Sequence, residues 1–355
     1  MRVTAEIDLK ALQHNLKRVR ASAPRAQVLA MVKANAYGHG LVLCSNNLDA
    51  EYLGIASLVE AHALRDAGVV KRIVFMPGIQ NQADLKALKE MSLDTVIYDE
   101  RQIALLRQYP SQDKTRVWLK INTGMHRLGC GYAHAARLLK ELEQLRHVEI
   151  VAVMTHLACA DEIDNSHNQK QFERFEALTR HWSYARSVLN SAGILNFPEF
   201  QYDIVRPGLM LYGASPIANQ TVQTLDLKPV MDMRASILAI DEVPAGEGVG
   251  YGITWSAKHA TKVAIVSSGY GDGYPQVPHH AKILINGTLC DVVGRVSMDF
   301  LAVDISHAGT VKEGDPAELW GKTLLVNDAA EYLDVSVYRL LTGVMERVPR
   351  QILNC

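Results

Sequence analysis

Segments of strand length alternate with helical or loop segments along the first 205 residues of the chain. Repeated strand-then-helix units force neighbouring strands to run parallel, and eight parallel strands are the number that closes a barrel. We therefore expect an α/β fold, a (β/α)8 TIM-type barrel, with an open doubly wound sheet as the alternative. The eight expected strands cover residues 28–32, 52–56, 72–76, 95–98, 117–121, 150–154, 186–189 and 202–205, and the last two have the weakest pattern.

The pattern changes after residue 225. Apolar and polar residues alternate from Met231 to Ile237, as in a strand with one buried face. Asn286-Gly287 separates two further strand patterns and predicts a hairpin turn, because both residues accept positive φ. We expect residues 1–225 to form the barrel and residues 226–355 to form a mainly β C-terminal domain. Further strands are expected at 262–266, 282–285, 291–296 and 301–304, and a helical tail near 328–341.

The composition argues against several classes of function. The chain has 355 residues, 48% of them hydrophobic and 21% charged, with a formal net charge of -1. Lys and Arg form no basic block, which argues against nucleic acid or a membrane surface as a partner. The start has no apolar core of signal-peptide length, and no apolar run approaches the ~18 residues of a membrane span. The five cysteines are scattered without Cys-x-x-Cys spacing, so we expect reduced thiols in the cytoplasm and no metal site.

Lys33 directly follows the apolar run 28–32. A strand that is apolar on both faces is buried in parallel sheet, and barrels place their chemistry at the carboxyl ends of such strands. A charged lysine is costly to bury there, which favours a neutral amine or an imine with a carbonyl cofactor. The alternative is a surface lysine just past the strand end. Tyr37, Gly38 and Gly40 suit a loop whose backbone and tyrosine hydroxyl approach a phosphate.

Two cationic side chains lie at or just after the expected strand 117–121. Alternation puts Lys120 and Asn122 on one face, so Lys120 can point into the barrel mouth. A lysine buried there needs an anionic partner or must lose its charge. Arg127 follows a glycine turn and can donate its rigid fork of N–H groups to an oxyanion. The alternative is a salt-bridged lysine and a solvated arginine.

His156 and Ser191 follow the next strands. A histidine that ends an apolar strand is either a site residue or a hydrogen-bonded residue of the core. Ser191 stands where helical sequence begins, so its hydroxyl and the free N–H groups can bind an anion or cap the helix.

The last expected barrel strand leads into Arg206-Pro207-Gly208-Leu209. Proline fixes the turn and glycine exposes backbone, so the N–H groups of Gly208 and Leu209 can face a phosphate. Barrels often bind phosphate after strands seven and eight, which agrees with this position. Arg206 can donate to a ring nitrogen or form a structural ion pair.

Residues 32–40, with the sequence VKANAYGHG, resemble the signature of the bacterial alanine racemases, and the resemblance runs nearly end to end. It implies an enzyme of fold type III that uses pyridoxal 5'-phosphate. By this resemblance Lys33 would form the imine with the cofactor and later act as a catalytic base.

The resemblance also implies a set of cofactor contacts. Arg206 would meet the pyridine nitrogen, and His156 would pack against the ring and bond Arg206. Arg127 would meet the phenolic oxygen and the substrate, and Lys120 would carry a carbamate that steadies Arg127. The phosphate would be held by Tyr37, Ser191, Gly208 and Leu209.

Residues of the C-terminal half match further segments of that family. Residues 248–252, GVGYG, match the stretch that holds the second catalytic base, which would be Tyr251 acting in the partner subunit's active site. The Met298 N–H would bind the substrate carboxylate, with Asp299 nearby. The resemblance therefore implies a homodimer with shared active sites.

Two more positions bear on the site. Residues 269–274 resemble a segment through which substrate enters, with Tyr270 narrowing the mouth. Some members of the family have a tyrosine that donates to the phosphate just before the Arg-Val-Pro motif, where this chain has Glu346. A carboxylate would repel phosphate, so we assign no phosphate role to Glu346.

The implied reaction is the interconversion of L-alanine and D-alanine. Racemisation requires a proton to leave Cα on one face and return on the other, and two bases on opposite faces achieve this directly. The product would supply peptidoglycan, or the enzyme would serve alanine catabolism.

Three alternatives stay open. The first is a racemase of broader specificity, although such enzymes commonly carry secretion signals. The second is a fold type III decarboxylase, which generally pairs the ring nitrogen with a carboxylate and not with a residue such as Arg206. The third is a non-catalytic protein that binds pyridoxal phosphate on a single barrel, which would lack a β domain with a base such as Tyr251.

Overall fold

The structure, a computed structural model, describes residues 3–110, 112–276 and 281–353. Eight parallel strands form a nearly closed barrel in the order β10-β2-β3-β4-β5-β6-β8-β9. The last strand lies beside the first, so the open-sheet alternative is wrong and the barrel prediction is confirmed. These strands are β2 (Gln27–Met31), β3 (Tyr52–Ile55), β4 (Arg72–Phe75), β5 (Asp94–Ile97), β6 (Thr115–Asn122), β8 (Val148–Met154), β9 (Ala185–Ser187) and β10 (Ile204–Val205).

Backbone hydrogen bonds complete the closure between β9 and β10. The Asp203 N–H donates to the Arg186 carbonyl at 3.1 Å, and the Arg206 N–H donates to the Leu189 carbonyl at 2.8 Å. A short strand β7 (Cys130–Gly131) pairs with the end of β6. The carboxyl ends of all eight barrel strands therefore meet at one mouth.

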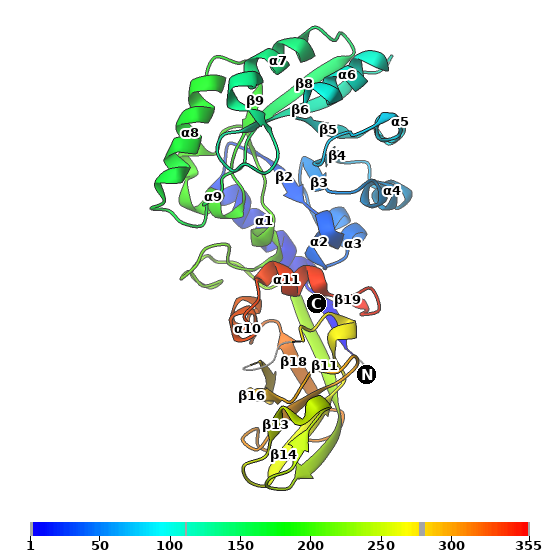
Figure 1. The fold of residues 1–355 in the computed structure, drawn as a ribbon, viewed down its shortest axis with the longest axis vertical. Coiled ribbons are helices and arrows are strands. Elements are labelled where there is room, and N and C mark those ends of the chain that lie inside the picture. Colours follow the sequence, from blue (N-terminus) through cyan, green and yellow to red (C-terminus); the bar gives the residue numbers. More distant parts are fainter. Residues whose placement is uncertain (1–2, 111, 277–280, 354–355) are drawn as a thin grey trace.

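Helices surround the barrel, as the upper part of Figure 1 shows. Asp8 caps the first of them, as its carboxylate accepts the Ala11 N–H at 2.9 Å. Residues 132–134 form a short 3-10 turn, and the chain becomes α-helical only at Ala135. The helices of this domain are α1 (Leu9–Ser22), α2 (Lys33–Tyr37), α3 (Leu41–Asn47), α4 (Leu58–Asp66), α5 (Gln82–Glu90), α6 (Glu100–Gln108), α7 (Ala135–Glu143), α8 (Ser166–Thr179) and α9 (Ser191–Asn196), with 3-10 turns η1 (Tyr132–His134), η2 (Pro198–Phe200) and η3 (Leu209–Tyr212).

The C-terminal domain is built on one long strand, β11 (Met231–Val243). Six strands follow the order β14-β17-β16-β15-β18-β11, and β11 also pairs with β14, so this sheet closes on itself. Asn286 and Gly287 have φ of 49° and 76° and form the predicted hairpin turn between β15 and β16. The other elements are β12 (Gly248–Val249), η4 (Tyr251–Ile253), β13 (Trp255–Ser256), β14 (Thr261–Val266), η5 (Tyr270–Asp272), β15 (Lys282–Ile285), β16 (Thr288–Val293), β17 (Leu301–Asp304), β18 (Pro316–Trp320) and β19 (Arg350–Ile352).

One strand of the C-terminal sheet comes from the start of the chain. β1 (Thr4–Ile7) pairs antiparallel with β11 and parallel with β19, so its residues lie in the second sheet although they precede the barrel in sequence. We propose that the domain boundary lies at residues 225 and 226, between η3 and β11, with β1 crossing from the barrel side.

The helical tail consists of two helices, α10 (Val326–Tyr332) and α11 (Val337–Gly343). Asp334 has φ of 49° and Ser336 caps α11 by accepting the Arg339 N–H at 3.2 Å, so the chain turns between the two helices. α11 lies at the junction of the two domains (Figure 1). A Cβ at Gly38, where φ is +83°, would lie 1.9 Å from the Leu341 carbonyl oxygen, so only glycine lets α11 approach the end of α2 this closely.

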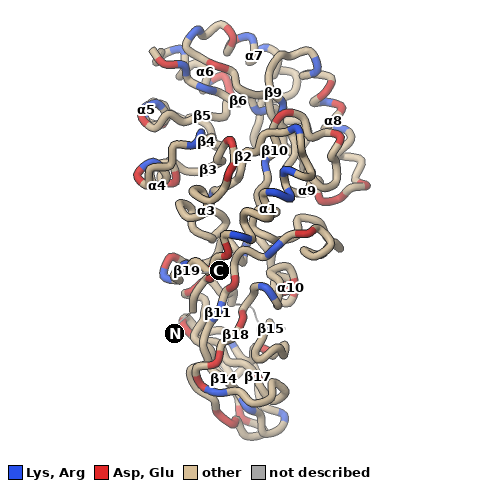
Figure 2. Tube along the Cα trace, turned by 180° about the vertical axis from the view of Figure 1, so that it is seen from behind, with Lys and Arg blue, Asp and Glu red and all other residues tan. Residues whose placement is uncertain are grey.

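Charged residues of both signs are interspersed over the two domains (Figure 2). This agrees with the absence of basic blocks in the sequence. Among the described residues, no helix has the length and apolarity that crossing a membrane requires. Nor do the described residues include a group of three or more His, Cys, Asp or Glu side chains suited to a metal ion. Cys355 lies outside the described residues.

Candidate active site

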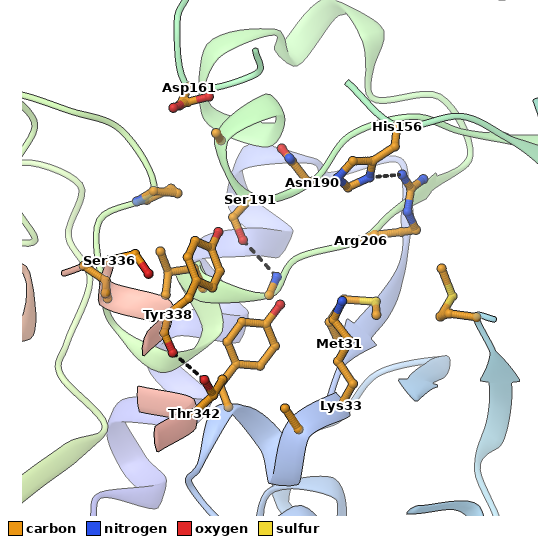
Figure 3. Close-up of a pocket in the computed structure, with 18 of the residues that line it drawn as sticks. Met31, Lys33, His156, Asp161, Asn190, Ser191, Arg206, Ser336, Tyr338 and Thr342 are labelled. Atoms are coloured by element: carbon orange, nitrogen blue, oxygen red, sulfur yellow. Dashed lines mark hydrogen bonds between the residues drawn. The ribbon is translucent and has the colours of Figure 1, made fainter. Parts of the chain in front are cut away.

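A cavity of ≈ 1080 Å³ opens at the carboxyl ends of the barrel strands. Figure 3 shows its side chains converging from barrel strands, barrel loops and α11. Nine residues singled out from the sequence line it together, namely Lys33, Tyr37, Lys120, Arg127, His156, Ser191, Arg206, Gly208 and Leu209.

Lys33 is placed by an unusual backbone. Residues 28–32 are buried, and residues 34–37, which follow Lys33, all have φ between 52° and 55° and form a left-handed turn. A residue with a Cβ in this conformation costs roughly 1–2 kcal/mol, so the turn stores strain that the surroundings must offset. Part of that support comes from Asn35, whose side-chain oxygen accepts the Leu41 N–H at 2.7 Å.

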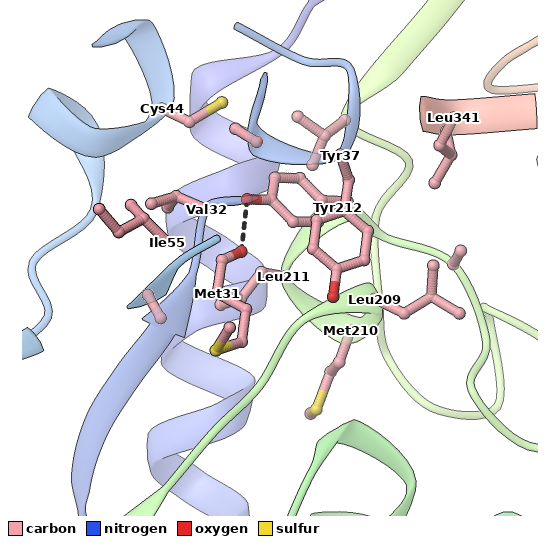
Figure 4. Packing of buried hydrophobic residues seen from close by; sticks show 14 of the residues in the cluster. Met31, Val32, Tyr37, Cys44, Ile55, Leu209, Met210, Leu211, Tyr212 and Leu341 are labelled. Carbon is pink, nitrogen blue, oxygen red and sulfur yellow. Dashed lines mark hydrogen bonds between the residues drawn. The ribbon is translucent and has the colours of Figure 1, made fainter. Parts of the chain in front are cut away.

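The side chains of His39 and Tyr212 also stabilise the turn. The His39 Nδ1–H donates to the carbonyls of Tyr37 at 2.9 Å and Ala36 at 3.1 Å. The Tyr212 ring stacks on those of His39 and Tyr37, with centroid distances of 4.6 and 4.9 Å. Its hydroxyl donates to the Met31 carbonyl at 2.9 Å (Figure 4). Burial lowers the pKa of His39 to about 4, so this ring is neutral at pH 7 and its Nδ1 proton stays on the backbone carbonyls.

Arg206 is only 3% exposed and is fixed by four partners. Its Nη1 donates to the Ser187 hydroxyl at 2.7 Å, and its Nη2 donates to the carbonyls of Thr155 at 2.6 Å and Val188 at 3.0 Å. The same Nη2 lies 3.2 Å from His156 Nδ1, which must therefore be the unprotonated acceptor (Figure 3). Burial lowers the pKa of Arg206 to about 9, which still leaves it charged at neutral pH.

The cavity has a surplus of positive charge. Lys33, Lys120, Arg127 and Arg206 line it, whereas Asp161 is the only carboxylate among its described lining residues. Burial and the three other cations lower the pKa of Lys120 to about 8, and burial followed by Arg127 lowers that of Lys33. Burial and the same four cations hold the pKa of His156 well below its usual value, so it is neutral. Such a site suits a ligand with several negative charges.

One wall of the cavity has the shape of an anion cradle. The Ser191 hydroxyl, labelled in Figure 3, lies in this wall. It accepts the N–H groups of Gly208 at 2.8 Å and Met210 at 3.2 Å. A Cβ at Gly208 would lie 2.4 Å from the Tyr37 hydroxyl oxygen, so the absence of a side chain there leaves room for that hydroxyl. Burial raises the pKa of Tyr37, which keeps the hydroxyl a donor. The donor set and the surrounding cations fit a phosphate ester, the group that the pyridoxal 5'-phosphate implied by the resemblance would place here.

Tyr338 of α11 also lines the cavity and was not singled out from the sequence. Its ring centroid lies 6.0 Å from that of Tyr37, on the same side of the cavity as Ser191 (Figure 3). The sequence places it eight positions before Glu346, which is exposed and does not line the cavity. Tyr338 reaches the cavity because α11 packs closely against Gly38. No local sequence pattern indicates that contact.

The four candidates from the C-terminal domain do not line the cavity of their own chain. Tyr251 is 73% exposed, Met298 53% and Tyr270 42%, which is unusual for such side chains in a folded domain. Asp299 lies 2.8 Å from an Arg347 nitrogen.

Arg347 joins the loops that carry these residues. It also lies 2.8 Å from the buried Asp272, and it donates to the Met298 carbonyl at 3.3 Å. Backbone N–H groups of Tyr270 and Gly271 donate to the carbonyls of Ser297 and Met298 at 3.1 and 2.9 Å. The two loops are therefore held as one unit on the surface of the C-terminal domain.

Comparison with known proteins gives matches over both domains. The family described as alanine racemase, N-terminal domain, matches residues 7–216, and alanine racemase, C-terminal domain, matches residues 230–352. An alanine racemase of Vibrio parahaemolyticus is 41% identical over 345 residues, which cover 96% of each chain. One from Shewanella woodyi is 42% identical and covers 97% of each chain. The solved structure of a biosynthetic alanine racemase from Pseudomonas aeruginosa has a TM-score of 0.94 at 37% identity, covering 99% of each chain.

We predict that Gly208→Ala weakens the binding of pyridoxal 5'-phosphate. The added Cβ would displace the Tyr37 hydroxyl, from which it would lie 2.4 Å, and a hydrogen bond to a charged group contributes about 1.5–3 kcal/mol. The dissociation constant, measured by absorbance titration of the apo protein, should rise about 10- to 100-fold. Gly131→Ala is the control, because its Cβ would meet only a His134 ring atom at 3.7 Å. An unchanged dissociation constant for Gly208→Ala would contradict the placement of the phosphate.

Proposed function

The chain belongs to the alanine racemase family, and we propose that it interconverts L-alanine and D-alanine with pyridoxal 5'-phosphate as its cofactor. The observation that carries this proposal is the position of Lys33, an amine of lowered pKa at a barrel mouth that also holds an anion cradle and three further cations. The neutral form of an amine is the form that bonds to an aldehyde, and a lowered pKa increases the fraction of Lys33 in that form.

The cavity residues divide between two ends of the cofactor. Tyr37, Ser191, Gly208 and Leu209 would hold the phosphate, with Tyr338 as an added donor. At the other end, Arg206 would face the pyridine nitrogen, His156 would lie against the ring, and Arg127 would bind the phenolic oxygen and the substrate carboxylate. When bound, the cofactor supplies an electron-accepting ring that makes the Cα–H of alanine more acidic.

Lys33 and Tyr251 of the partner subunit would be the two bases. Lys33 would take or return the Cα proton on one face of the substrate, and Tyr251 of the partner subunit would do so on the other. Because one base gives back what the other removed, the net reaction changes only the configuration at Cα. Arg206 stays protonated at neutral pH, so it binds as a fixed cation and does not itself transfer a proton.

A homodimer with shared active sites would bring the barrel cavity of one chain together with the Tyr251 and Met298 loops of the other. In a single chain Tyr251 and Met298 are exposed on the C-terminal domain, apart from the cavity that contains Lys33. A second copy that places its C-terminal domain over the barrel mouth would bury these side chains and bring the Met298 N–H to the substrate carboxylate, with Asp299 nearby and Tyr270 at the mouth.

Lys120 would carry a carbamate. A pKa of about 8 leaves a minor but appreciable fraction of its amine neutral near physiological pH, and the neutral amine can attack carbon dioxide. The new N–C bond forms as the nitrogen of the neutral amine loses a proton to solvent, which leaves an anion among the cations of the cavity. Starting from the protonated amine, two protons leave in all. That anion would steady Arg127, whose charge lies close enough to lower the pKa of Lys120.

The cellular setting we propose is the cytoplasm, with D-alanine used for peptidoglycan or formed and consumed in alanine catabolism. The described cysteines, Cys44, Cys130, Cys159 and Cys290, form no disulfide, which supports a reducing compartment. The proposed partners are the small-molecule substrate and a second copy of the chain.

We predict that the purified chain racemises L- and D-alanine only when pyridoxal 5'-phosphate is present. Polarimetry should show the rotation of either enantiomer decay to zero, because the two products are mirror images of equal free energy. Lys33→Ala should abolish this decay, since it removes one of the two bases and the amine that holds the cofactor. The control is protein that absorbance shows to be free of cofactor. The proposal is contradicted if this protein racemises alanine at the same rate before and after pyridoxal 5'-phosphate is added.

We also predict that two inactive variants complement each other. Lys33→Ala and Tyr251→Phe chains, mixed under conditions of subunit exchange, form hybrid dimers in which one of the two sites keeps both bases. Random exchange should then restore about a quarter of the wild-type activity, because about half of the dimers are hybrids with one intact site. Each variant alone is the control. An inactive mixture in which native mass spectrometry detects the hybrids would place both bases within one chain.

A further inference from the structure

Gln171 is a polar residue on the buried face of α8, where a helix that covers a barrel normally presents an apolar side chain. Its exposed fraction is 0%. It does not line the active-site cavity, and no role in the reaction assigned above involves it.

Its side-chain amide makes three hydrogen bonds to the ends of two barrel strands. The Oε1 atom accepts the Ala158 N–H at 2.8 Å, and Nε2 donates to the His156 carbonyl at 2.9 Å. Nε2 also donates to the Thr123 hydroxyl at 3.1 Å. These partners fix the orientation of the amide, because Ala158 offers only a donor and His156 only an acceptor. The amide thus holds the backbone on both sides of the His156 side chain.

The Thr123 hydroxyl connects Gln171 to the residue that binds Arg206, namely Thr155. It lies 2.8 Å from the Thr155 hydroxyl, which donates its own proton to the Ile121 carbonyl at 2.8 Å. A hydroxyl has one proton, so Thr123 must be the donor to Thr155, and the bonds form one directed chain from Gln171 to β6. The Thr155 carbonyl in turn accepts the Arg206 Nη2–H at 2.6 Å.

The same face of α8 holds the loop that leads from β6 to Arg127. His167 Nε2 lies 3.1 Å from the Gly124 carbonyl oxygen, and Arg174 donates to the Thr123 carbonyl at 3.0 Å. Gly124 has φ of +152°, and a Cβ there would lie 3.1 Å from Gln171 Cγ. No larger residue fits between this loop and the Gln171 side chain without displacing one of them.

We propose that Gln171 is a positioning residue that sets the relative placement of His156, Arg206 and the Arg127 loop, and thereby the cofactor ring and the substrate carboxylate. The inference rests on the proposed function, because it assumes that these three side chains contact the cofactor. It follows from one buried amide bonding the ends of β6 and β8 at once, with Arg206 on the next carbonyl. An apolar side chain of the same size would fill the space and leave the two strand ends free to shift.

The chain offers a matched control in Gln102 of α6, which is 3% exposed. Its Oε1 accepts the N–H groups of Tyr98 at 2.8 Å and Asp99 at 3.1 Å, and its Nε2 donates to the Ile79 carbonyl at 3.0 Å. It therefore makes as many side-chain hydrogen bonds as Gln171, also from a barrel helix. None of its three partners lines the cavity.

The test compares Gln171→Met, Thr123→Val and Gln102→Met with wild type, each loaded with pyridoxal 5'-phosphate. The readouts are the thermal midpoint, the cofactor dissociation constant, the absorbance maximum of the bound cofactor, and kcat and KM for both alanine enantiomers. We expect Gln171→Met and Gln102→Met to lower the thermal midpoint to a similar extent. Only Gln171→Met should raise the cofactor dissociation constant, by about tenfold, shift the absorbance maximum and raise the KM of both enantiomers.

Thr123→Val removes only the two hydrogen bonds of the Thr123 hydroxyl, to Gln171 and to Thr155, and leaves the sequence of α8 unchanged. It should therefore shift the same readouts in the same direction by a smaller amount. If Gln171→Met does not fold, Thr123→Val alone tests the inference. The inference is overturned if the folded Gln171 or Thr123 variant keeps the wild-type absorbance maximum, dissociation constant and KM, or if Gln102→Met changes them equally. A wild-type chain that neither binds the cofactor nor racemises alanine would instead refute the proposed function, and this inference with it.

Discussion

Closure of the parallel barrel is the constraint on which the rest of the structure depends. Because β10 lies beside β2, Lys33 and Arg206 share one mouth although most of the barrel sequence separates them. The carboxyl ends of β6 and β8 open at the same mouth and bring Lys120 and His156 to it. A parallel barrel thus gathers side chains from distant loops without any of them needing to be close in sequence.

The charge gathered at that mouth determines what the cavity can bind. The buried Lys120 and Arg206, the half-buried Lys33 and the exposed Arg127 lie around this cavity, and one carboxylate among the described lining residues does not balance their charge. Burial and the neighbouring cations lower the pKa of Lys120 and of His156. The balance must come from a ligand or from a modified side chain. A phosphate ester, a substrate carboxylate and a carbamate on Lys120 each add negative charge. The positive charge of the cavity therefore favours the binding of cofactor and substrate and the modification of Lys120 for the same reason.

Much of this could be predicted from the sequence because the main signals are local. Apolar runs located all eight barrel strands, and Asn286-Gly287 located a hairpin. The left-handed turn after Lys33 could not be predicted, because alanine disfavours this conformation and part of its support comes from the distant Tyr212, which packs on Tyr37 and donates to the Met31 carbonyl. β1 joins the second sheet only through pairing with distant strands. Tyr338 and Gln171 were missed for the same reason, since an isolated tyrosine or glutamine on a helix carries no sign of its distant partners.

The most direct measurement is borohydride reduction of the cofactor-loaded protein followed by peptide mass mapping. If Lys33 is the residue that holds pyridoxal 5'-phosphate, the reduced phosphopyridoxyl group will be found on the peptide that contains residues 32–40, and the Lys33→Ala chain will carry none. A protein that racemises alanine while the label is found on Lys120, on another lysine or on none would contradict the assignment.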